Sequence, residues 1–227
     1  MMIAYDVLRF LGRPIRKAGM VRPKWLYSDK KASEKTQKYL RSTPTPALHF
    51  GCGINRFKGW LNLDIGGKAD IACDFTKPLR FLTANSFQYC YSEHVLEHFP
   101  RKQALKMTQE IYSSLKPGGV FRVAIPDLDS LLEQYSNYKK DLYEEVHRGF
   151  ASFYGEAFYT RGELLDISMR GWGHQYMYNE EDLTLLLKSV GFRSIVRKQH
   201  RDSDHAIFQG IETRPAQQSS LILEACK

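Results

Sequence analysis

The sequence predicts an α/β protein built on a doubly wound, mostly parallel sheet. Three observations support this fold class. A glycine turn at residues 51–53 directly follows a short apolar run, two later short runs end in Asp64 and Asp74, and residues 115–127 combine a Pro-Gly-Gly turn with a buried strand pattern. Because parallel sheets bind ligands beyond the carboxyl ends of their strands, the glycines and both aspartates should share one rim.

The glycine turn follows the run Ala-Leu-His-Phe at residues 47–50. Glycine has no Cβ and accepts positive φ, so a ligand can lie directly against this backbone. A dinucleotide fingerprint needs a third glycine at position 56, where Arg56 stands, and an acid about 20 residues further on. Asp64 comes too early for that role, which disfavours nicotinamide and flavin cofactors. No Gly-Lys-Ser/Thr sequence follows, which excludes a Walker loop.

The two aspartates end the second and third expected strands, at residues 60–64 and 70–74. A carboxylate on this rim can accept hydrogen bonds from both hydroxyls of a ribose, and one on the next strand can accept from an adenine amino group. Either aspartate could instead cap a helix or close a turn. Their joint placement beside the glycines favours a nucleoside site.

Later elements complete the α/β pattern. We expect a helix from Lys102 to Leu115, a fifth strand at residues 118–125, and a helix at 179–191 with an Asn cap and a closing glycine. The last two strands are expected near residues 193–198 and 220–226. The chain therefore alternates strands and helices up to its final strand pair.

Taken in order, these motifs resemble the class I S-adenosylmethionine-dependent methyltransferases, and most closely a type 11-like branch. The resemblance spans roughly residues 46–128 and resumes at 173–192 and in the final strand. It implies a Rossmann-like methyltransferase fold with a seven-stranded sheet, S-adenosylmethionine as cofactor, and a trimmed first helix, because residues 54–59 are too short for the usual one. The matching pieces are Gly51-Cys-Gly53, Gly59-Trp60-Leu-Asn-Leu-Asp64, Asp74, Ser92-Glu-His94-Val-Leu-Glu97-His98, Leu115-Lys-Pro-Gly-Gly119 and Pro126-Asp127-Leu.

The resemblance also implies a cofactor site. The methionine part would contact the backbone near Gly51 and Gly53, the ribose Asp64, and the adenine the region of Asp74. His49 and Asn55 stand where the family usually has an acid and a glycine, so how the cofactor's ammonium is held stays open. A scaffold that kept the fold and lost the chemistry is therefore an alternative. The expected cofactor contacts are Phe50, Gly51, Cys52, Gly53, Asp64, Ile65, Asp74, Phe75, Glu93 and His94.

Methyl transfer from a sulfonium is an in-line displacement, so the protein mainly aligns the reactants, which can contribute roughly 7 to 11 kcal/mol. A base is needed only if the acceptor must lose a proton. We expect it among His94, His98, Asp127 and His174. Asp127 could instead be a turn residue after Pro126, and His174 could simply pack in its Gly-Trp-Gly-His turn.

His94 and His98 flank Glu97 with the spacing of an inverted zinc peptidase motif. That chemistry needs a third protein ligand and an open coordination position. No convincing ligand follows in the sequence, although His174 could approach in space. The sequence therefore predicts no metal site, with a divalent metal shared by Glu97, His98 and His174 as the alternative.

Residues 127–178 form an expected helical insertion after the fifth strand, which we interpret as a substrate-binding or lid segment. It holds 11 of the 29 aromatic residues of the chain. Tyrosine suits stacking on sugars or rings, although most of these side chains could simply bury a small subdomain. The resemblance favours a saccharide hydroxyl or carboxyl as acceptor, or another small molecule. The oligomeric state is not predicted.

Charge divides the chain into a basic arm at residues 1–41 and a methyltransferase domain at 42–227. The arm holds 11 Lys/Arg and 3 Asp/Glu, whereas the domain holds 22 of each. The arm could be solvated, cover the cofactor site, or rest peripherally on an anionic membrane such as the inner face of the cell membrane. A neutral domain argues against nucleic acid as a partner.

The four cysteines are scattered without paired spacing, which predicts reduced thiols and a cytoplasmic protein. No apolar run approaches the roughly 18 residues of a membrane-spanning helix, and the amino terminus lacks the pattern of a secretion signal.

Overall fold

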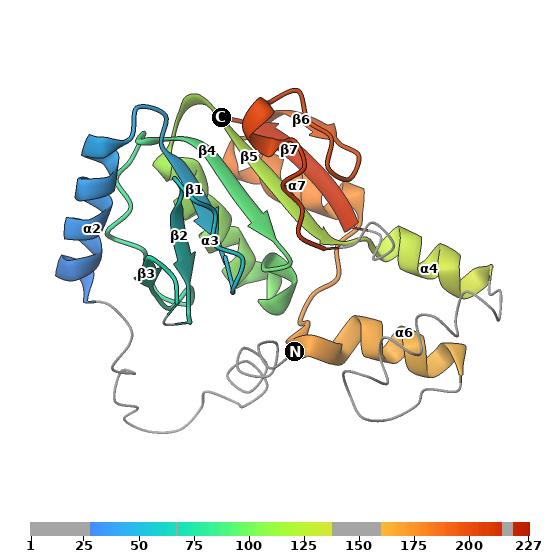
Figure 1. Cartoon of the computed structure of the whole chain (residues 1–227). Coiled ribbons are helices and arrows are strands. Elements are labelled where there is room, and N and C mark those ends of the chain that lie inside the picture. The colour runs from blue at the N-terminus through green and yellow to red at the C-terminus, as the bar shows by residue number, and fades with distance from the viewer. Residues whose placement is uncertain (1–27, 67, 138–159, 215–219) are drawn as a thin grey trace, which may run out of the picture.

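The computed structural model describes residues 28–66, 68–137, 160–214 and 220–227. Its centre is a seven-stranded sheet in the order β3-β2-β1-β4-β5-β7-β6 (Figure 1). Neighbouring strands are parallel from β3 to β5, and β7 runs antiparallel to both β5 and β6. The predicted α/β fold is confirmed. The strands are β1 (Ala47–Phe50), β2 (Leu61–Asp64), β3 (Ile71–Ala72), β4 (Phe87–Glu93), β5 (Leu115–Pro126), β6 (Arg193–Arg197) and β7 (Ser220–Cys226).

Helices flank this sheet and lie close to their expected positions. In α7 the Asn179 side chain accepts the Asp182 N–H, and Gly191 ends the helix in the left-handed conformation with φ of 118°. The described α-helices are α2 (Asp29–Ser42), α3 (Arg101–Ser114), α4 (Leu128–Ser136), α6 (Arg161–Arg170) and α7 (Glu180–Val190). The described residues also form the short 3-10 turns η1 (Leu96–His98), η2 (Gly171–Gly173) and η3 (Ala206–Phe208).

The main hydrophobic core lies between one face of the sheet and the helices α3 and α7. Leu48 and Phe50 of β1, Ile111 of α3 and Leu187 of α7 are all fully buried in it. Burying one such side chain contributes about 1.5 to 3 kcal/mol, so this face supplies much of the driving force for folding.

The opposite face has no helix between β1 and β2, because residues 51–60 form only turns. The trimmed first helix is thus confirmed. Aromatic side chains fill its place: Tyr91 and Phe208 are buried here, with Phe57 and Trp60 packed against them. The coil at residues 198–214, which we call the 198–214 segment, carries Phe208 and covers this face.

A buried ion-pair network ties the 198–214 segment to the sheet. Arg122 of β5 is wholly buried and donates to Glu212 and Glu224, each at 2.6 Å. It also donates to the backbone carbonyl of Asp202 at 2.8 Å. Buried charges are tolerated only when paired and hydrogen-bonded, so this arginine fixes where the segment lies.

His49 lies on the same aromatic face. It is buried, its ring stacks on Phe57 with 4.3 Å between ring centroids, and its Nδ1 lies 3.2 Å from the Asn62 side-chain oxygen. Burial lowers the pKa of His49 to about 4, although the contact with Asn62 and the charge of Glu93 act in the opposite direction. The residue that replaces the family's usual acid is therefore neutral near pH 7.

This depressed pKa predicts a loss of stability in acid. The unfolded chain protonates His49 near pH 6.5, whereas the folded chain does so only near pH 4. The contribution of neutral His49 to the free energy of unfolding is fully present above pH 6.5 and is lost as the pH falls to about 4. At pH 4 the loss amounts to about 3 kcal/mol. Urea unfolding of the native protein and of His49→Gln between pH 7 and 4 measures it. If the free energy of unfolding of the two proteins changed with pH in the same way over this range, the prediction would be contradicted.

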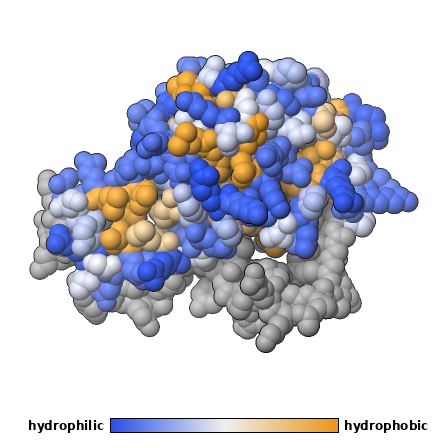
Figure 2. Space-filling model, turned by 180° about the vertical axis from the view of Figure 1, so that it is seen from behind, coloured by the Kyte–Doolittle hydropathy of each residue, from blue (hydrophilic) through white to orange (hydrophobic). Residues whose placement is uncertain are grey.

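The insertion after β5 begins with α4, which directly follows the carboxyl end of β5, and continues with α6, which lies beside α4 (Figure 1). We call these two helices the α4–α6 lobe. Leu132 and Met169 of the lobe are 43% and 39% exposed, and Figure 2 shows hydrophobic surface on it. Tyr178 is buried in the main core, as the structural alternative for these aromatics expects. Seven other predicted aromatics lie outside the described residues: Tyr138, Tyr143, Phe150, Phe153, Tyr154, Phe158 and Tyr159.

Most of the predicted basic arm, residues 1–27, lies outside the described part of the chain. Its remainder forms α2, which packs on the domain through the buried Ala32 and Thr36. The four cysteines, Cys52, Cys73, Cys90 and Cys226, are all free, as predicted. Among the described residues, no helix has the length and apolar character needed to cross a membrane.

Candidate active site

The glycine turn needs its two glycines for different reasons. Gly51 and Gly53 have φ of 79° and 52°, a region that side chains with a Cβ rarely adopt. A Cβ on Gly51 would lie 2.2 Å from a methyl carbon of Val95, so the turn packs tightly there. A Cβ on Gly53 would meet nothing within 4 Å. The turn therefore presents bare backbone to open space at the carboxyl end of β1.

Asp64 joins this turn to the end of β2. One carboxylate oxygen accepts the Gly53 N–H at 2.8 Å, and the other accepts the Gly66 N–H at 2.8 Å. The residue is 8% exposed. A carboxylate oxygen can accept more than one hydrogen bond, so both retain capacity for a ligand. The structure thus brings Gly53 and Asp64 into direct contact on the predicted rim.

Asp74 lies further along the same rim, and one of its oxygens closes a turn. That oxygen accepts from the backbone N–H and the hydroxyl of Thr76 at 2.9 and 2.7 Å. Phe75 stacks on Phe50 with 4.1 Å between ring centroids, which places this turn beside the end of β1. The other predicted contacts of this region are Cys52, which is buried, and Ile65, which is half-buried.

Glu93 ends β4, and the 198–214 segment binds it. Its carboxylate accepts the backbone N–H groups of Thr213 and Arg214 at 3.1 and 3.0 Å. Thr213 in turn accepts from the Asn55 side chain at 3.0 Å. Thr213 and Arg214 thus form part of the rim, although sequence reasoning did not find them. They lie about 120 residues from Glu93 with no local motif to signal the contact.

His94 follows Glu93 and has a strained backbone, with φ of 53°. Its N–H donates to the Ala124 carbonyl at 2.9 Å, which holds it at the end of β4 and β5. One ring nitrogen, Nε2, lies 3.0 Å from the Ser220 hydroxyl oxygen, and the other, Nδ1, lies 3.3 Å from a Glu97 oxygen. The ring is thus held between two polar partners.

Glu97 is the centre of a histidine cluster and has no exposed surface. The same Glu97 oxygen lies 3.9 Å from Nε2 of His98. Burial raises the pKa of Glu97, but the contact with His94 and the charges of His98, His94 and His174 outweigh it and lower the pKa to about 2. The cluster therefore holds a buried, ionised carboxylate.

His174 reaches this cluster because the chain after η2 docks on η1. The backbone N–H groups of Gln175 and Tyr176 donate to the Glu97 carbonyl at 2.7 and 3.1 Å. The His174 Nδ1 lies 2.9 Å from the Ser168 carbonyl oxygen. A carbonyl only accepts hydrogen bonds, so this nitrogen carries the proton and Nε2 has the lone pair. Three of the four predicted catalytic candidates, His94, His98 and His174, are thus brought together.

Asp127, the fourth candidate, has structural partners instead. One carboxylate oxygen caps α4 by accepting the Asp129 and Ser130 N–H groups at 3.1 and 3.5 Å. The other accepts from Arg197 at 2.8 Å. Asp127 forms no described hydrogen bond with the histidine cluster and caps a helix. We therefore leave it out of the proposed catalytic group.

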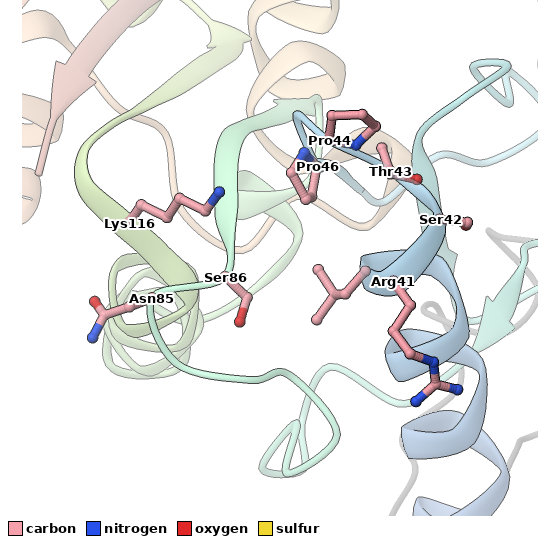
Figure 3. A pocket seen from close by; sticks show the side chains of 9 residues that line it. Arg41, Ser42, Thr43, Pro44, Pro46, Asn85, Ser86 and Lys116 are labelled. Atoms are coloured by element: carbon pink, nitrogen blue, oxygen red, sulfur yellow. The ribbon is translucent and has the colours of Figure 1, made fainter.

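A cavity of about 500 Å³ opens elsewhere, at the amino ends of the strands (Figure 3). Pro46 precedes β1, Ser86 precedes β4 and Lys116 lies at the start of β5. Parallel α/β sheets bind ligands at the opposite edge, and the predicted site residues lie there as well. We therefore do not assign the active site to this cavity.

The comparisons with known proteins agree with the observed fold. A solved S-adenosylmethionine-dependent methyltransferase from Archaeoglobus fulgidus has a similar structure, with a TM-score of 0.51 and 14% sequence identity. The match covers 88% of this chain and 95% of the Archaeoglobus chain. Residues 66–123 match the family described as Methyltransferase domain. The fold and this partial match support a class I S-adenosylmethionine-dependent methyltransferase.

Two further solved structures are similar at lower TM-scores. One, from Mesorhizobium loti, is also an S-adenosylmethionine-dependent methyltransferase, with a TM-score of 0.49, 16% identity and coverage of 88% of this chain and 100% of its own. The other is phosphoethanolamine N-methyltransferase 2 from Haemonchus contortus, with a TM-score of 0.48 and 16% identity. The match covers 86% of this chain but only 52% of the Haemonchus chain, about half its length. No curated protein matches the sequence.

Proposed function

We propose that this methyltransferase binds S-adenosylmethionine on the rim formed by the glycine turn, Asp64, Asp74, Glu93 and His94, and methylates a small-molecule acceptor. The observation that carries the proposal is the contact between Asp64 and Gly53, which sets a carboxylate beside bare backbone facing open space. An uncharged backbone surface next to a carboxylate that accepts hydrogen bonds fits a nucleoside, whose ribose has two hydroxyls to donate.

When bound, S-adenosylmethionine supplies an electrophilic methyl group on a sulfonium. The chain's own contribution is to hold the reactants in line, and Asp64 and Gly53 do this for the nucleoside end. Holding the reactants in line can lower the activation free energy of the reaction by roughly 7 to 11 kcal/mol. Alignment is therefore the main catalytic effect that we assign to the rim.

We assign the role of general base to His94. A residue other than glycine with positive φ is held in place at a cost, and such strain is concentrated at functional sites. Glu97 lies against Nδ1 of the ring, which leaves Nε2, now beside the Ser220 hydroxyl, to take a proton from an acceptor. His98 and His174 complete the environment of Glu97 and act as positioning residues.

We propose a saccharide hydroxyl or carboxyl as the first acceptor class to test. This choice rests on the sequence resemblance. A radiolabelled methyl donor incubated with carbohydrate, lipid and RNA extracts tests it. Label found in the carbohydrate fraction agrees with the proposal, and label confined to the RNA fraction contradicts it.

Replacing Asp64 by Asn should weaken cofactor binding. Asn offers one accepting oxygen in place of two, so either Gly53 or Gly66 loses its acceptor along with the charge. Hydrogen bonds to charged groups contribute about 1.5 to 3 kcal/mol, so we expect Kd to rise roughly 10- to 150-fold. Calorimetry with S-adenosylmethionine and its demethylated product measures this.

The matched control is Asp166→Asn, which changes an exposed aspartate that, among the described residues, pairs with Arg170 on α6. It should bind cofactor like the native protein. Equal affinity in Asp64→Asn would show that the site is assigned to the wrong residues. No heat from the native protein with either ligand would favour the alternative of a scaffold that has lost the chemistry.

A further inference from the structure

The cluster of Glu97, His98 and His174 holds a polar group that its protein surroundings leave unsatisfied. Glu97 is wholly buried, and among the described residues neither of its carboxylate oxygens has a hydrogen-bond partner of good geometry. The same is true of the buried Nδ1 of His98. Leaving buried polar atoms without partners is costly, so such atoms in a native protein indicate a missing ligand, water or ion.

The three side chains also converge. One potential ligand atom from each of Glu97, His98 and His174 lies within 4.8 Å of the other two. Ligand atoms around a tetrahedral zinc ion at about 2.0 to 2.2 Å stand roughly 3.4 Å apart. Side-chain rotations would have to bring these atoms closer together to bind the ion. Two imidazoles and one carboxylate match the protein ligands of many catalytic zinc sites, with a fourth position left for water or substrate.

His174 is already oriented as a metal ligand. Its Nδ1–H donates to the Ser168 carbonyl, which fixes the tautomer and leaves the lone pair on Nε2. Metal-binding histidines generally donate their other ring N–H to a carbonyl or carboxylate in this way. The docking of Gln175 and Tyr176 on the Glu97 carbonyl holds the two halves of the cluster together.

We propose that Glu97, His98 and His174 bind one divalent transition-metal ion, with Zn²⁺ as the preferred occupant. The site lies next to His94, at the edge of the sheet where we place the reaction. Zinc suits imidazole and carboxylate ligands. An ion at this place would satisfy buried polar atoms that have no hydrogen-bond partner among the described residues. Metal binding does not depend on the proposed methyl transfer and is measured without it.

The test uses the full-length, untagged protein. It is stripped with a chelator, incubated with ZnCl₂ and dialysed, and its zinc content is measured by mass spectrometry. We expect one zinc per chain and a thermal unfolding midpoint that rises with zinc. Substitution by Co²⁺ should give visible absorption bands typical of a four- or five-coordinate site. A native protein that binds no zinc overturns the proposal, whereas bound iron in place of zinc at the same three residues supports the site and corrects its metal.

Variants identify the ligands. His98→Gln and His174→Gln should each raise the Kd for zinc by more than about tenfold, since even losing a partner behind a ligand costs 10- to 100-fold. The matched control is His200→Gln, whose histidine bonds only the Arg214 carbonyl among the contacts described and lies outside the cluster. Circular dichroism checks that each variant is folded. Zinc affinity in His174→Gln equal to that of the native protein overturns the proposal.

Discussion

Replacing Arg122 by Met should lower the free energy of unfolding by about 3 to 5 kcal/mol. Methionine has a similar length but no charge, so it leaves Glu212 and Glu224 buried without the partner that each contacts at 2.6 Å. Both acids are at most 6% exposed, so water cannot replace the arginine without opening the face. Urea unfolding followed by tryptophan fluorescence measures the change, because Trp60 packs against the same face.

Two comparisons make this prediction specific. Arg193→Met changes an exposed arginine of β6 and should cost less than about 1 kcal/mol. Adding Glu212→Gln and Glu224→Gln to Arg122→Met should recover part of the loss, because a buried ion pair removed as a whole costs far less than one broken on one side. If Arg122→Met lowers the free energy of unfolding no more than Arg193→Met does, the ion-pair network does not hold the 198–214 segment.

The fold could be predicted because local signals mark the ends of its elements. Asn179 and Gly191 bound α7 through cap chemistry, and residues 220–226 were expected as the last strand and form β7. The glycine turn and Asp64 were expected on one rim, and the hydrogen bond from Gly53 places them there. In each case, residues near in sequence carry the information.

The contacts that sequence reasoning missed join residues far apart in the chain. Glu93 meets Thr213, and Arg122 meets Glu212, only after the 198–214 segment has folded over the sheet. No periodicity marks a coil that takes the place of a helix. Asp127 could not be resolved for a different reason: an acid after a strand can cap a helix or face a ligand, and only its bonds to α4 and Arg197 distinguish the two.

Replacing His94 by Asn should lower the rate of methyl transfer by about 10² to 10⁴, the usual contribution of a general base. Asparagine is the suitable replacement because it tolerates the positive φ of this position better than most residues, so the backbone should stay in place. It cannot take up a proton. The measurement is a single-turnover rate with cofactor and acceptor both saturating, which separates the chemical step from binding.

A control and a second variant decide what such a loss means. His205→Asn changes a histidine that packs on Tyr89 and Phe208, away from the carboxyl edge, and should keep the native rate. Ser220→Ala removes the hydroxyl beside Nε2 and should change the rate little, since the acceptor replaces that contact in the reaction. If His94→Asn keeps the native rate while Ser220→Ala loses it, the proton does not pass to the imidazole, and the strained backbone at residue 94 serves only to shape the rim.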